Sequence, residues 1–146
     1  MGSESSIYKS SVKLTLEGAK VMLAAAERKS KEIGVPMDIA IVDEGGNILV
    51  FERMDGAKIT GIDIAINKAF TGACSRKGTH EYAEVASPGK PAFGIHVSNQ
   101  GRFMIIGGGL PVLVKEEVVG GIGCSSGTAE RDRIVAQAAI DALPKR

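Results

Sequence analysis

Glycine is concentrated in the last third of the chain, where residues 101–126 read GRFMIIGGGLPVLVKEEVVGGIGCSS. The chain has 19 glycines in 146 residues, about twice the ordinary usage. Glycine in a strand adds no side-chain packing, so it usually marks a bend, a bulge or the close approach of a ligand or another backbone. Two interpretations follow: a twisted antiparallel sheet packed tightly against helices, or a floor on which a flat ligand rests. The glycines alone do not choose between them.

Length and composition predict one soluble domain over residues 14–146, preceded by a flexible arm over residues 1–13. The net charge is +1 and the chain has only four Phe, two Tyr and no Trp. Nucleic-acid binding is therefore not expected, because it needs a basic surface or stacking aromatics. The longest uncharged apolar stretch, residues 103–114, is too short to cross a bilayer. We therefore expect no membrane partner.

Cysteine usage indicates a reducing compartment. Cys74 and Cys124 are the only two cysteines, and they form neither a CxxC pair nor a cluster with histidine. This pattern disfavours a disulfide framework or a zinc site. It predicts a cytoplasmic protein.

Periodicity and turn residues predict nine elements. One apolar stripe joins Leu16, Ala19, Leu23, Ala26, Ser30 and Ile33, which is helical spacing between a cap at Thr15 and a stop at Gly34. The further elements are a hairpin over 37–43 and 47–53, a helix from Thr60 to about Arg76, a short helix from Thr79, strands over 103–106, 110–115 and 118–125, and a helix from about Thr128. The order αββααβββα predicts an α+β fold with a five-stranded antiparallel sheet and helices on its faces.

Histidine supplies the main candidates for site chemistry. His80 begins the sequence H-E-x-x-E, in which the imidazole and Glu84 would share one helix face. The zincin motif needs a second histidine at that position, so a metal site and an ordinary charged turn both stay open. His96 lies in the Pro- and Gly-rich segment 87–102, beside Asn99 and Arg102. Long ordered loops in compact domains are often functional.

Seven segments together resemble the GlcG/HbpS-type family, which also forms the C-terminal domain of PduO-type corrinoid adenosyltransferases. They are LTLEGA (14–19), IVDEGGN (41–47), RMDGA (53–57), AINKAF (65–70), PAFGIH (91–96), GGGLP (107–111) and VGGIG (119–123). The resemblance runs from about Leu14 to the C-terminus. It implies a profilin-like fold, a homo-oligomer and, for some members, haem binding.

The resemblance makes a tetrapyrrole the leading ligand hypothesis. The chain would be a non-catalytic accessory protein that binds haem or a corrinoid in support of a metabolic pathway. The first helix and the segment before it contain no histidine, so His96 or His80 would be the iron ligand. Lys90 and Arg102 would supply cations for the propionates, and Asn99 lies beside them. The alternative is a small enzyme that acts on an oxidised metabolite, with His96 and a nearby carboxylate as acid and base.

A homo-oligomer is the expected assembly. It could form by packing the glycine-rich sheet surface, or equivalent helices, against a second copy. Ala24, Ala25, Ala69 and Ala73 are small enough to let two helices approach closely.

Overall fold

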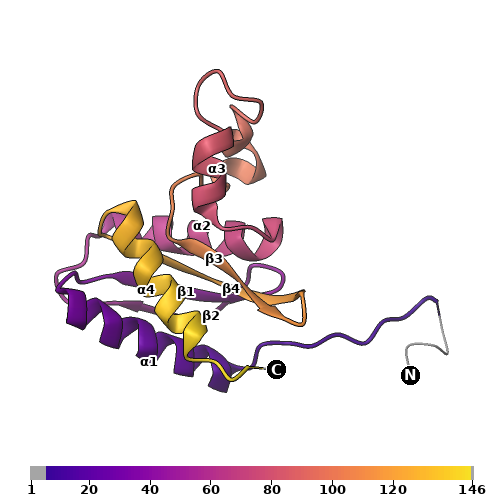
Figure 1. Cartoon of the computed structure of the whole chain (residues 1–146), viewed down its shortest axis with the longest axis horizontal. Coiled ribbons are helices and arrows are strands. Elements are labelled where there is room, and N and C mark those ends of the chain that lie inside the picture. Colours follow the sequence, from indigo (N-terminus) through magenta and orange to yellow (C-terminus); the bar gives the residue numbers. More distant parts are fainter. Residues whose placement is uncertain (1–5, 146) are drawn as a thin grey trace.

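The computed structural model describes residues 6–145 as one antiparallel sheet with helices on both faces (Figure 1). Residues 1–5 of the predicted arm and Arg146 lie outside the described residues. The helices are α1 (Leu16–Ile33), α2 (Thr60–Ser75), α3 (Thr79–Val85) and α4 (Ala129–Asp141), with 3₁₀ turns η2 (Ile95–Val97) and η3 (Asn99–Gly101). The strands are β1 (Asp38–Asp43), β2 (Ile48–Arg53), β3 (Gly109–Val114) and β4 (Glu117–Ser125).

The sheet has four strands in the order β2-β1-β4-β3, and every neighbouring pair is antiparallel. The α+β class fits, but the predicted five strands and the order αββααβββα are wrong. Residues 103–106 form no strand. The Met104 amide instead donates to the Thr71 hydroxyl at 2.9 Å, and the Phe103 ring packs edge-on against Tyr82. Residues 103–106 are therefore held by a side-chain hydroxyl of α2 and by an aromatic contact, not by pairing with a strand.

Local signals fix the ends of α1 as expected. The Thr15 hydroxyl accepts a hydrogen bond from the Gly18 amide at 3.0 Å, and Gly34 takes a left-handed conformation with φ 74°. Helix α2 begins at Thr60 as predicted, but it has no such cap: the residue before it is Ile59, and no side chain caps that end. The first turn of α2 therefore leaves its amide groups without a side-chain cap.

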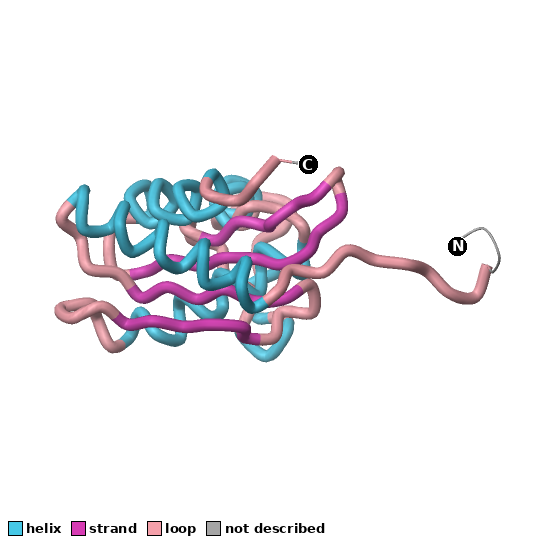
Figure 2. The backbone as a smooth tube through the Cα atoms, turned by 90° about the horizontal axis from the view of Figure 1, so that it is seen from below, coloured by secondary structure: helices cyan, strands magenta, loops and turns pink. Residues whose placement is uncertain are grey.

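Two apolar layers hold the sheet between its helices. Helices lie on both faces of the sheet (Figure 2). On one face Ile39 and Ile41 of β1 pack against α1 and α4. On the other face Ala40 and Val42 of β1 pack against α2. The stripe predicted on α1 is partly wrong. Leu16 is 49% exposed, whereas Met22, which lies outside that stripe, is completely buried.

We expect Ile41→Ala to lower the free energy of unfolding by about 2–5 kcal/mol. The side chain is completely buried in the layer under α1 and α4, so truncation leaves a cavity. Urea denaturation followed by circular dichroism measures the loss. A loss below about 1 kcal/mol would place Ile41 outside the effective core.

The glycines of β4 let α2 lie directly on the strand backbone. A Cβ atom added to Gly123 would lie 2.1 Å from the Ala65 carbonyl oxygen, and one added to Gly121 would lie 2.6 Å from that of Ala69. The first interpretation of the glycine-rich stretch is therefore confirmed. A ligand floor on this face is excluded because the helix occupies it.

The same packing removes most of the small residues proposed for contact between copies. Ala69 and Ala73 lie on the face of α2 that packs against the sheet and are buried, and Ala25 of α1 is buried as well. Of that set, only Ala24 is exposed. The buried alanines are therefore not available for contact between copies, whereas Ala24 on α1 is.

None of the helices among residues 6–145 is both long enough and apolar enough to cross a membrane.

Candidate ligand site

The candidate residues lie on a projection that rises from one end of the sheet, formed by residues 79–102 (Figure 1). Its root is Thr79, which is completely buried. The Gly109 amide at the start of β3 donates to the Thr79 hydroxyl at 2.9 Å. The Glu81 carboxylate accepts from the Gly78 amide at 3.0 Å and holds the first turn of α3. The projection is thus tied to the sheet at its base.

Backbone hydrogen bonds order the segment that follows α3, although it contains no strand. The Ala92 amide donates to the Val85 carbonyl at 2.9 Å and closes the loop between them. A series of three-residue turns then runs through Ile95 and Ser98 to Arg102. Gly94, with φ 103°, allows the sharp change of direction before η2. The segment is therefore an ordered part of the fold.

His96 lies in η2 with one ring nitrogen buried and unsatisfied. Its Nδ1 atom has no hydrogen-bond partner, and its ring lies 5.9 Å from that of Phe93. Phe93 and Val97 on either side are 58% and 71% exposed. Buried polar atoms are nearly always paired, so an unpaired one needs an explanation. An imidazole between two exposed apolar side chains is a suitable donor for a flat apolar ligand.

His80 lies lower, at the second residue of α3. Its Nδ1 atom is also buried without a partner, close enough to Gly78 that an added Cβ there would lie 2.6 Å away. Its own Cβ lies against Gly107. His80 therefore sits at the base of the projection, in a more confined position than His96.

The three polar residues named with the histidines are spread along the same segment. Lys90 is exposed, and the Asn99 side-chain oxygen accepts from the Ser98 hydroxyl. The Arg102 guanidinium lies 3.8 Å from the centre of the Phe70 ring on α2. Among residues 6–145, none of these side chains forms a hydrogen bond, ion pair or ring contact with another of the five candidates. The structure thus gathers them on one projection without building a closed pocket from them.

The alternative acid–base pair has no geometric support. Within the part of the chain that the structure describes, no carboxylate forms a hydrogen bond or ion pair with His96, and no group of three or more His, Cys, Asp or Glu side chains could hold a metal ion. The H-E-x-x-E sequence serves as a capped helix start through Glu81.

The structure contains a buried ion pair that the sequence patterns did not predict. Lys68 of α2 and Asp132 of α4 meet at 2.9 Å, and each residue is at most 2% exposed. The Lys68 ammonium also donates to the Cys124 carbonyl at 3.0 Å, and Asp132 accepts from the Gly127 amide at 2.9 Å. In the sequence, Lys68 lies at helical spacing from Ala65 and Gly72, which are both buried on α2. This spacing is the one local indication that Lys68 is buried.

Asp38, at the start of β1, is a second buried acid. It is completely buried, and neither carboxyl oxygen has a hydrogen-bond partner. The group faces the start of α2, where a Cβ on Gly61 would lie 2.1 Å from Oδ2. Burial raises the pKa of Asp38, while Arg53 opposes the shift. This acid lies inside the sheet–helix layer, away from the projection.

Glu52 on the edge strand β2 makes stability depend on pH. Burial first, and the adjacent Glu27 carboxylate second, raise the pKa of Glu52 from 4.5 to about 7. Between these values the folded chain keeps a proton that the unfolded chain has lost. The stabilisation is complete below pH 4.5 and is lost as the pH rises through 7.

We therefore expect the melting temperature to fall as the pH rises from 5 to 8, because Glu52 loses its proton in this range. Glu52→Gln should make this fall smaller. Thermal unfolding across the range measures it. Glu32→Gln, at an exposed position of α1, is the matched control for the substitution itself. An identical profile for Glu52→Gln and wild type would contradict the assignment.

The chain is similar in sequence and in structure to proteins of one family. Residues 14–141 match the family model described as "Haem degrading protein HbpS-like". An uncharacterized 15.0 kDa protein in the dhaT-dhaS intergenic region of Citrobacter freundii is 47% identical over 128 residues, which cover 88% of this chain and 90% of that protein.

The corrinoid adenosyltransferase PduO of Salmonella typhimurium is 32% identical over 132 residues. The match covers 90% of this chain but only 39% of PduO. A crystal structure of a PduOC:haem complex superposes with a TM-score of 0.87 at 32% identity, over 90% of this chain and 96% of that one.

Proposed function

Because the chain belongs to the HbpS-like family, we propose that it binds haem on the projection as an accessory protein and catalyses no reaction of its own. The observation that carries the proposal is the likeness to PduOC, whose structure was determined as a haem complex and which matches 90% of this chain. The proposal extends only to binding.

The described residues offer donors suited to haem. His96 would supply the axial ligand, because exposed apolar side chains flank its imidazole. The ligating atom would be Nε2, since Nδ1 is buried away from an incoming iron. Lys90 and Arg102 would pair with the propionates, and the Asn99 amide would add a hydrogen bond. When bound, haem supplies a redox-active iron whose properties depend on its axial ligand.

Because the projection is open, we propose that a second protein surface covers the haem in the complex. Phe93, Val97 and Val85 are all more than two-fifths exposed, whereas cofactor sites enclose most of their ligand. A homo-oligomer, which we also propose, would provide the opposing wall. The protein would then hold haem where two surfaces meet.

Titration of the purified protein with haemin tests the proposal. We expect a saturable Soret band with one haem per chain, and no competition from hydroxocobalamin. Non-saturating association would contradict haem binding, and displacement by hydroxocobalamin would make a corrinoid the ligand. Loss of the Soret band on adding ascorbate in air would instead indicate haem degradation and contradict a purely binding role.

A further inference from the structure

Residues 6–13 form an extended arm that leaves the body of the molecule at the start of α1 (Figures 1 and 2). Tyr8 is 73% exposed and Val12 is 37% exposed. Ile7, directly before Tyr8, is also exposed, at 76%. Residues 6–13 also carry Lys9 and Lys13 and no acidic residue. They therefore form a basic stretch with three exposed apolar side chains.

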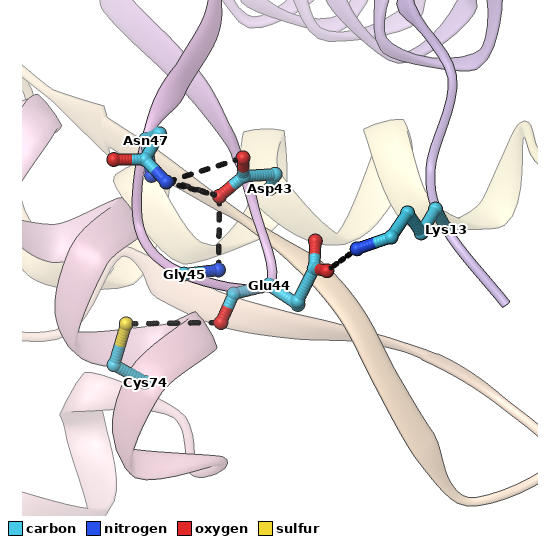
Figure 3. Close-up of polar contacts among 6 residues, drawn as sticks. All are labelled: Lys13, Asp43, Glu44, Gly45, Asn47 and Cys74. Atoms are coloured by element: carbon cyan, nitrogen blue, oxygen red, sulfur yellow. Dashed lines mark hydrogen bonds and ion pairs between the residues drawn. The ribbon is translucent and has the colours of Figure 1, made fainter. Parts of the chain in front are cut away.

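The base of the arm is fixed beside the loop between β1 and β2. Lys13 forms an ion pair with Glu44 in that loop (Figure 3). The Asp43 carboxylate orders the loop by accepting from the amides of Gly45 and Asn47, each at 2.9 Å. The arm thus starts from a defined point and runs outward.

A hollow of about 540 Å³ lies at the same end of the sheet. Its lining has three carboxylates and one guanidinium. Its apolar part comes from the C-terminal end of α2 and the start of β4. The lining residues are Glu44, Ala73, Cys74, Arg76, Glu116, Glu117 and Val118. Lys13 already pairs with Glu44, so Glu116 and Glu117 remain against Arg76, and their charge is complementary to Lys9 of an arm.

We propose that the arm of a second copy lies in this hollow, and that two copies exchange arms reciprocally. Eight extended residues reach about 26–29 Å, so an arm that runs away from its own body can reach another. Glu44 both holds the base of one arm and lines the hollow. A two-fold axis beside Glu44 therefore lets each arm leave one copy and enter the other.

Charge complementarity selects a second copy over another occupant. Lys9 would meet Glu116 and Glu117 on the hairpin of the partner, while Tyr8 and Val12 would cover Val118. In one chain Lys13 already pairs with Glu44, and the arm that precedes it runs away from the body of the molecule (Figure 2). The exchange supplies the surface for assembly that the buried alanines do not.

Disulfide trapping with the native Cys74 tests the exchange. Cys74 is an exposed free thiol that lines the hollow, whereas Cys124 is completely buried. We expect Tyr8→Cys to give a covalent dimer under mild oxidation on a non-reducing gel. A disulfide requires Cα atoms about 4.4–6.8 Å apart, so trapping reports real proximity.

Two matched variants make the result decisive. The dimer should disappear in Tyr8→Cys/Cys74→Ser, and an exposed cysteine on α3, Ala83→Cys, should not form one with Cys74. Absence of a dimer from Tyr8→Cys would overturn the proposal. Oxidation of both thiols within a monomer would also overturn it, because the arm would then occupy its own hollow.

Charge reversal gives an independent measurement. In sedimentation equilibrium, Lys9→Glu should weaken dimerisation about tenfold, since the exchange repeats the ion pair on both sides. Adding Glu117→Lys to the same chain should restore it. An unchanged dimer in Lys9→Glu, or no recovery in the double variant, would contradict the pairing.

Discussion

Gly123→Ala is expected to lower the free energy of unfolding by about 3 kcal/mol or more, beyond the usual cost of an overpacked core. The new methyl group would lie 2.1 Å from the Ala65 carbonyl and 2.5 Å from the Ala69 amide. Both obstacles are helix backbone, which cannot turn aside as a side chain can. Helix α2 would have to lift from β4, and the layer formed by Ala40 and Val42 would open.

Chemical denaturation followed by circular dichroism measures this loss, with soluble yield as a second readout. Gly45→Ala is the matched control. It lies in the exposed loop between β1 and β2, where the nearest obstacle is the flexible Asn47 amide at 3.1 Å. Equal stability of the two variants would contradict direct helix-on-strand packing.

Lys68→Ala is expected to cost about 3–5 kcal/mol, because it leaves the buried Asp132 carboxylate without its cation. The pair joins α2 and α4, which cover opposite faces of the sheet. Its loss also leaves the Cys124 carbonyl without the Lys68 donor. The effect should therefore exceed that of losing any surface ion pair in the chain.

A double variant separates the charge from the packing. Lys68→Met/Asp132→Leu removes both charges and keeps most of the volume, so it should recover a large part of the loss. The surface pair of Lys31 with Glu27 provides the control, and Lys31→Ala should cost less than about 1 kcal/mol. A loss of this small size for Lys68→Ala would show that the pair contributes little.

The local signals of the sequence predicted most elements correctly. The Thr15 cap, the Gly34 stop and the loop after Asp43 all act through nearby backbone, so their effect is visible in short segments. Residues 103–106 show the limit of this reasoning. Their composition is that of a strand, but a tertiary contact with Thr71 decides their structure.

The buried charges show the same limit at the level of side chains. Lys68 is a charged residue on a helix, and only the position of Asp132, 64 residues later, makes its burial favourable. Four of the five candidate ligand residues lie in the loop rich in Pro and Gly, a kind of segment that often carries function, whereas His80 belongs to the H-E-x-x-E sequence of α3. Their arrangement on an open projection depends on the anchoring of Thr79 to β3, which no local pattern encodes.

The Soret spectrum of the haemin complex in His96→Ala tests the central claim most directly. His96 is flanked by exposed apolar side chains, whereas His80 is confined at the base of the projection. We predict that His96→Ala loses the wild-type Soret position and binds haemin at least about tenfold more weakly. The matched variant His80→Ala should keep both properties. If His96→Ala retains the wild-type spectrum and affinity, ligation by His96 is wrong.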